Sequence, residues 1–99
     1  MKSFAELKNE ELRLIVLQLL SQSADYRASA QLLHQALPSF SHAVGMERLG
    51  IELAWLQVKG LARVDSVGGV DMAVLTQLGA DVAEGREVVS GVKRPRPGD

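Results

Sequence analysis

The N-terminal third of this 99-residue chain carries apolar residues at helical spacing. Apolar side chains recur three or four positions apart at Leu12, Ile15, Val16, Leu19 and Leu20. This spacing predicts an amphipathic helix over residues 10–22. Leu14 and Leu17 add a second stripe, so the helix is apolar around much of its circumference.

A helix that is apolar on most sides has to be covered by another surface. Either the other helices of its own domain cover it, or it pairs with its copy in a second chain. The second interpretation predicts a homodimer. The candidate interface residues are Leu12, Leu14, Leu17 and Leu20.

The next segment contains a break and a short helix. Residues 23–28 interrupt the helical pattern, and Tyr26-Arg27 fits a short strand. Ser29 is placed to cap a helix over residues 30–37, because its hydroxyl can accept from the first free backbone N–H groups. A proline ends this helix, since the residue before a proline is pushed out of the helical conformation.

A longer apolar pattern follows the proline. It consists of Met46, Leu49, Leu53 and Leu56, with Val44, Ile51, Trp55 and Val58 as an adjacent stripe. The pattern predicts a helix from Ser41, which would cap it, to about Lys59, with Gly60 as the left-handed residue that ends it. Gly45 and Gly50 each weaken this helix by roughly 1 kcal/mol relative to alanine, so its first two turns should be its least stable part.

Alternating residues then predict a β-hairpin and a closing helix. Residues 61–65 and 70–75 fit two strands, and the glycines at positions 68 and 69 suit a tight turn that needs positive φ. Thr76 is placed to cap a last helix that runs to about Glu84.

This order of elements is typical of a winged helix-turn-helix domain. We therefore expect a mainly α fold with a small β-hairpin, formed by residues 1–85. Residues 86–99 are rich in glycine, proline and charge, and we expect a flexible basic tail there. This tail carries a net charge of +2, whereas residues 1–85 carry a net charge of −3.

Composition narrows the possible function classes. Apolar residues make up 46% of the chain, which is enough for one small core. The absence of cysteine excludes disulfides and thiolate metal ligands. No stretch reaches the roughly 20 apolar residues of a membrane span, and acidic residues near the N-terminus do not fit a signal peptide. We expect a cytoplasmic protein with no membrane contact.

Three segments carry a resemblance to known proteins. The run from Glu52 to Val64, with Lys59-Gly60-Leu61 inside it, resembles the end of the third helix and the start of the wing in bacterial winged-helix proteins. The run from Leu75 to Gly85 resembles the passage after the wing. With the terminal Val92-Lys93-Arg94-Pro95, the chain is similar to a small family of Mu-like phage and prophage proteins, often labelled ArsR-like transcriptional regulators. The resemblance implies a winged-helix fold and a place in the bacterial host cytoplasm.

Metal sensing and catalysis find no supporting motif. ArsR-type sensors, which are similar in fold, need clustered thiolate, imidazole or carboxylate ligands. Here His34 and His42 are eight residues apart, which favours surface or capping roles for both. Neither a nucleophile elbow nor a phosphate loop is present. We expect no metal, no cofactor and no enzymatic activity.

DNA binding as a transcriptional regulator is the first functional hypothesis. In a winged helix, the start of the third helix enters the major groove and the wing approaches the DNA backbone. Arg48 could read guanine, while Ser41 or His42 could contact phosphate. Basic residues on the wing and in the tail would add phosphate contacts. The complete candidate set is Ser39, Ser41, His42, Arg48, Arg63, Lys93, Arg94 and Arg96.

Protein binding is the alternative hypothesis. Several acidic residues would face DNA phosphates with the wrong sign. They are Glu47 and Glu52 on the third helix, and Asp65 and Asp71 around the wing. An apolar third helix beside an acidic wing suits contact with a host or phage protein. Val44, Ile51 and Val58 would be its anchors where they are exposed, but we expect more of these positions to belong to the core.

Overall fold

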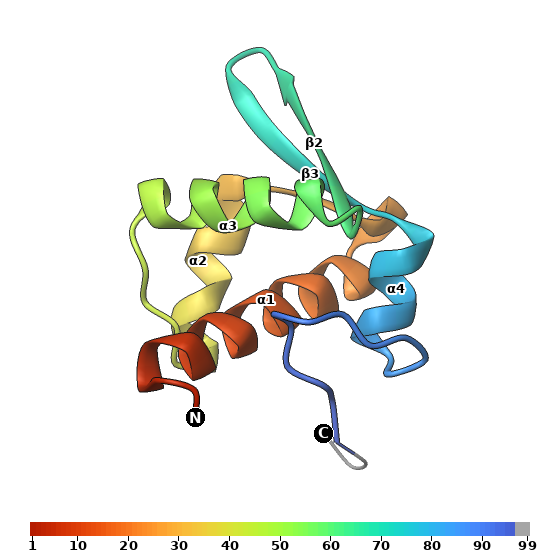
Figure 1. Cartoon of the computed structure of the whole chain (residues 1–99). Coiled ribbons are helices and arrows are strands. Elements are labelled where there is room, and N and C mark those ends of the chain that lie inside the picture. The colour runs from red at the N-terminus through yellow and green to blue at the C-terminus, as the bar shows by residue number, and fades with distance from the viewer. Residues whose placement is uncertain (97–99) are drawn as a thin grey trace.

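The hairpin of this protein projects away from a group of helices (Figure 1). The computed structural model describes residues 1–96, and within this range it contains four α-helices and three β-strands. They are α1 (Phe4–Gln22), β1 (Arg27–Ser29), α2 (Ala30–Ala36), α3 (Met46–Val58), β2 (Ala62–Val67), β3 (Val70–Leu75) and α4 (Gln77–Ala83). Two short 3₁₀ turns, Ala24–Tyr26 and Leu37–Phe40, precede β1 and follow α2. The architecture is a mixed α/β domain.

The first helix, α1, begins at Phe4, earlier than the predicted start at residue 10. Ser3 caps it, because its Oγ accepts a hydrogen bond from the Glu6 backbone N–H at 3.1 Å. The apolar pattern did not include this first turn, since Phe4 and Leu7 are exposed. None of the helices in residues 1–96 combines the length and the apolar character that a membrane span requires.

The inward side of α1 forms the centre of the core. Four leucines of α1 are each 5% exposed or less within one chain: Leu12, Leu14, Leu17 and Leu20. They belong to one buried cluster with Leu33 of α2 and Leu49 of α3. The predicted dimer interface through these four leucines is therefore wrong, because almost none of their surface is left for a second chain. The helices and sheet of the same domain cover α1 instead.

The sheet is antiparallel and has the strand order β1-β3-β2. Ala73 of β3 pairs with Val64 of β2 on one side and with Ala28 of β1 on the other. Gly68 and Gly69 form the hairpin turn with φ values of 59° and 78°, in the left-handed region that favours glycine. The predicted hairpin is confirmed, and β1 makes it a three-stranded sheet.

The predicted closing helix is also present. Its N-cap is Thr76, whose Oγ1 accepts from the Gly79 N–H at 3.0 Å. A Cβ on Gly79 would overlap the backbone carbonyl oxygen of Leu61. Glycine at this position therefore lets α4 lie directly against the chain that leads into β2.

The third helix starts later than predicted. Gly45 is the N-cap of α3, and Met46 is its first residue. Ser41 has a left-handed φ of 68° at the end of a 3₁₀ turn, and the His42 N–H donates to the Leu37 carbonyl at 3.1 Å. The predicted start of this helix at Ser41 is wrong, because the hydrogen bond from the His42 N–H closes the preceding 3₁₀ turn at this point. The chain turns inward at His42 before α3 begins.

Residues 86–96 pack against the helices. The Lys93 N–H donates to the Glu10 carbonyl of α1 at 3.0 Å, and Val92 is buried. The prediction of a flexible tail outside the domain is therefore wrong for residues 86–96. Although this segment is mostly polar, the buried Val92 side chain and the Lys93 backbone hydrogen bond hold it against the helices. Residues 97–99 of the predicted tail lie outside the described part of the chain.

Candidate interaction surface

One side of α3 points away from the core and is apolar. It consists of Met46, Gly50, Ile51, Ala54 and Val58, which we call the outward face of α3. All five residues are exposed, with Ile51 at 59% and Val58 at 84%. The expectation that most of the three candidate anchors belong to the core is wrong, because Ile51 and Val58 are on the surface. Val44 is partly buried against the core.

Few charged side chains lie on the exposed side of α3. Within this helix they are Glu47, which lies among the apolar residues of the outward face, and Arg48 at its edge, whose side chain is 43% exposed. Arg48, the predicted guanine reader, is directed to its own domain instead. Its Nε lies 3.1 Å from Glu52 Oε2, and its guanidinium also donates to the side chain of Asn9 in α1.

A buried ion-pair network lies behind the outward face. Glu52 is only 3% exposed, and its Oε1 accepts from Arg13 Nε of α1 at 2.6 Å. Burial of Glu52 corrects the prediction that it would face a partner. Glu52 lies three residues after Leu49 and four before Leu56, on the inward side of the helix. The helical spacing therefore indicated that Glu52 is buried, although its charge suggested an exposed residue.

Arg13 also connects the C-terminal segment to the helices. Its guanidinium carbon lies 4.0 Å from the centroid of the Trp55 ring, within the range of a cation–π contact. Its Nη1 donates to the Gly91 carbonyl at 2.9 Å. A Cβ on Gly91 would clash with the Trp55 ring, so this glycine permits the close approach. Sequence reasoning missed this set, whose members lie far apart along the chain.

A second polar cluster joins α1, the α2–α3 connection and the C-terminal segment. His42 is buried, and its Nε2 lies 2.8 Å from Glu11 Oε1. Lys93 Nζ lies 3.2 Å from Glu11 Oε2. Hydrogen bonds from His42 and then Lys93 lower the pKa of Glu11 below its ordinary value. The prediction of a surface or capping role for His42 is wrong, because the His42 and Lys93 side chains both contact Glu11 within the domain.

The other residues that were predicted to contact DNA near α3 do not lie together on one surface. Arg63 is exposed on β2, where Asp65 and Asp71 are exposed on the same hairpin. Ser39 is exposed in the 3₁₀ turn after α2. Ser41 follows it and lines a depression with residues from the start of α1, not the outward face of α3.

The basic residues of the C-terminal segment lie elsewhere. Arg86 Nη2 is 2.8 Å from Asp81 Oδ1, and its guanidinium also contacts Glu84, so it is neutralised at the end of α4. This pairing lowers the pKa of Asp81. Arg94 and Arg96 line a groove of about 780 Å³.

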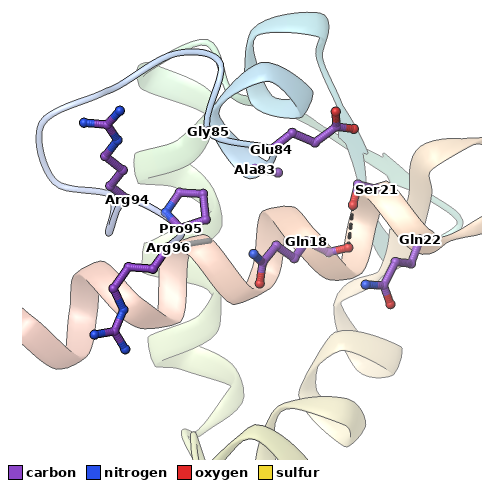
Figure 2. A pocket seen from close by; sticks show the side chains of 9 residues that line it. All are labelled: Gln18, Ser21, Gln22, Ala83, Glu84, Gly85, Arg94, Pro95 and Arg96. Atoms are coloured by element: carbon purple, nitrogen blue, oxygen red, sulfur yellow. Dashed lines mark hydrogen bonds between the residues drawn. The ribbon is translucent and has the colours of Figure 1, made fainter. Parts of the chain in front are cut away.

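This groove runs between α1, the end of α4 and residues 94–96 (Figure 2). Figure 2 shows the side chains of Arg94 and Arg96 extending to opposite sides of Pro95 and away from Gln18. Within α1, the Ser21 hydroxyl donates to the Gln18 carbonyl at 2.7 Å. The two arginines therefore flank the groove and do not converge on one point inside it. No group of three or more potential metal ligands occurs within residues 1–96.

Two curated proteins are similar to this chain. The chain is 35% identical over 92 residues to the uncharacterized protein gp26 of Escherichia phage Mu, and the match covers 93% of this chain and 95% of that protein. It is 32% identical over 76 residues to an uncharacterized protein of Haemophilus influenzae, a match that covers 76% of this chain and 74% of that protein. No protein-family model matches the chain.

Proposed function

This chain belongs to the family of the phage Mu protein gp26, and we propose that it is a winged-helix module of a Mu-like phage or prophage that binds another protein chain. The winged-helix assignment is supported by the element order and by the sheet. A short strand after α1 joins the hairpin that follows α3, and the hairpin takes the place of the wing.

The outward face of α3 is the observation that carries the proposal. In a winged helix that reads DNA, the third helix needs basic and polar side chains directed at base edges and phosphates. Here that side of α3 bears Met46, Ile51 and Val58. The charged side chains beside them are Glu47 and Arg48, and Arg48 is paired with Glu52. Exposed apolar side chains with few charges among them are typical of the centre of a protein–protein interface.

DNA binding, the first hypothesis from the sequence, has less support from the side-chain contacts. Arg48 is tied to Glu52 and Asn9, and Lys93 is tied to Glu11. A DNA contact by either side chain would have to compete with these intramolecular bonds. The protein-binding alternative requires no such rearrangement, so we place it first.

The proposal is tested by a pull-down with the tagged full-length chain from lysates of infected and uninfected host cells, with and without nuclease. The Ile51→Asp variant removes the apolar centre of the outward face. Leu32→Asp, on α2, is the matched control, because Leu32 is 55% exposed against 59% for Ile51. We expect a protein that remains bound after nuclease, is lost with Ile51→Asp and is kept with Leu32→Asp.

The opposite result is equally well defined. Specific DNA fragments that are lost on nuclease treatment, dissociate steeply with salt and are unaffected by Ile51→Asp would overturn the protein-binding proposal. They would support the regulator hypothesis and direct mutagenesis to Arg48 and Arg63.

A further inference from the structure

We propose that the C-terminal segment occupies a peptide-binding site, and that this site accepts the sequence Gly-Val-Lys from another chain as well as from its own. The site consists of Glu10, Glu11 and Arg13 of α1 and Trp55 of α3, and residues 91–93 occupy it. We call it the Gly-Val-Lys site. In Figure 1, the C-terminal segment runs from the end of α4 across α1. The site contains no residue of the outward face of α3, so this inference is independent of the proposed function.

The site recognises the glycine by its shape and by its carbonyl group. The Gly91 carbonyl accepts a hydrogen bond from Arg13 Nη1 at 2.9 Å. The φ of Gly91 is 97°, and a Cβ at this position would come within 2.5 Å of the Trp55 ring. Backbone conformation and space therefore both favour glycine over any residue with a side chain.

The next two residues are recognised by different contacts. The Val92 side chain is 7% exposed and belongs to the core cluster. The Lys93 N–H donates to the Glu10 carbonyl at 3.0 Å, and Lys93 Nζ lies 3.2 Å from Glu11 Oε2. A site reads a short extended peptide in this way, through main-chain hydrogen bonds for affinity and side-chain contacts for specificity.

Residues 88–90 form a linker between this ligand and the rest of the domain. The Arg86 and Glu87 N–H groups donate to the Asp81 carbonyl and hold the start of the segment at α4. Val88 is 62% exposed, and in the described part of the chain no hydrogen bond joins the linker to a helix or strand. The Gly-Val-Lys sequence can therefore leave its site without disrupting α4.

The length of the contact and the tether decide when a second peptide binds. A contact through three residues is small, so its binding is reversible. A short tether gives the chain's own ligand an effective concentration in the millimolar range. A peptide added in trans therefore competes with the natural segment only at a comparable concentration, whereas it binds without competition once that segment has left the site.

The test uses the full-length variant Val92→Asp, which keeps every residue of the site but carries a carboxylate where the site buries a valine. We expect its segment to leave the site and the emission of Trp55, the single tryptophan, to shift to longer wavelength. A synthetic peptide of natural residues 86–96, which lacks tryptophan, should restore the natural emission in a saturable titration up to millimolar concentration. Val88→Asp makes the same change at an exposed valine of the segment. This matched control should keep the natural emission without any peptide.

Two altered peptides test whether the site reads the sequence. Gly91→Ala in the peptide should weaken its binding to the Val92→Asp chain by about ten-fold or more, because the added methyl group meets the Trp55 ring. Lys93→Ala in the peptide should weaken binding by about three-fold at low ionic strength, because its contact with Glu11 is partly exposed to water.

Three results would overturn the inference: a Val92→Asp chain that keeps the natural emission, a natural peptide that leaves the emission of this variant unchanged, or a Gly91→Ala peptide that binds as well as the natural one. Circular dichroism shows whether the variant is folded. If it is unfolded, the measurement is made by nuclear magnetic resonance on the isotope-labelled natural chain. Unlabelled peptide at millimolar concentration should then convert part of the Gly91 amide signal into that of a released segment. A Gly91 signal that does not respond to the peptide would also overturn the inference.

Discussion

Arg13 Nε lies 2.6 Å from Glu52 Oε1 and connects the middle of α1 to the middle of α3. Both side chains are largely removed from water, and the same guanidinium stacks on Trp55. A buried charge that loses its partner is costly, because the remaining group stays desolvated without compensation. This pair therefore has more influence on stability than the exposed ion pairs of the domain.

We expect Arg13→Ala to lower the free energy of unfolding by about 3 kcal/mol, since it leaves Glu52 buried with only Arg48 as a partner. Urea denaturation followed by circular dichroism measures the change. Arg63→Ala, at an exposed position on β2, is the control and should stay within about 0.5 kcal/mol of the natural chain. Equal effects of the two substitutions would contradict a structural role for the buried pair.

Two glycines should respond to alanine in opposite directions. Gly91 has a φ of 97°, and a Cβ there would meet the Trp55 ring, so Gly91→Ala should lower the free energy of unfolding by about 1–3 kcal/mol. Gly50 lies in a helix with open space around it, so Gly50→Ala should raise that free energy by up to about 1 kcal/mol. Trp55 is the single tryptophan, and its fluorescence should shift to longer wavelength only in Gly91→Ala.

These glycine measurements belong at low protein concentration, because Gly50 lies on the outward face of α3, the proposed interaction surface. A Gly91→Ala variant with natural stability and an unchanged emission spectrum would mean that residues 86–96 are not held against Trp55 in solution.

The sequence predicted those parts of the fold that depend on neighbouring residues. The caps at Ser29 and Thr76 and the glycine turn of the hairpin are local signals, and the elements they define are present. The C-terminal segment was predicted as a free tail because its attachment depends on a contact between Arg13 and Gly91, 78 residues apart. A single sequence carries no local trace of such a contact.

The candidate site shows the same division between local and distant information. Helical spacing placed Ile51 and Val58 on α3, but it did not show that both are exposed. The same spacing could not show that Arg48 and Lys93 would be engaged by Glu52 and Glu11, because a basic residue looks equally available in the sequence whether or not a carboxylate lies beside it in the fold.

Acid should weaken the attachment of the C-terminal segment through Glu11. The pKa of Glu11 is lowered in the folded state by His42 and Lys93, below its ordinary value of 4.5. A carboxyl group with a lowered pKa contributes stability that is fully present above its unfolded pKa and is lost as the pH falls through its folded pKa. The natural chain should therefore lose stability below about pH 4.5, and Glu11→Gln should lose less over the same range.

Urea denaturation at neutral pH and at several values below pH 4.5 measures this difference. Glu47→Gln, which removes an exposed carboxyl of α3, is the control and should keep the pH dependence of the natural chain. Identical pH profiles for Glu11→Gln and the natural chain would show that the His42–Glu11–Lys93 cluster does not contribute to acid sensitivity.

Glutamate substitutions at two apolar positions should separate the core from the interaction surface. Leu14 of α1 is 5% exposed, so Leu14→Glu would bury an unpaired carboxylate, and we expect it to abolish the cooperative urea transition at neutral pH. Ile51 of α3 points outward, so Ile51→Glu should keep the natural circular dichroism spectrum and midpoint while losing the partner. A Leu14→Glu chain that folds normally but becomes monomeric would return the dimer interface to α1. A chain that unfolds only when Leu14 is changed would confirm that the leucines of α1 serve the core and that α3 presents the available surface.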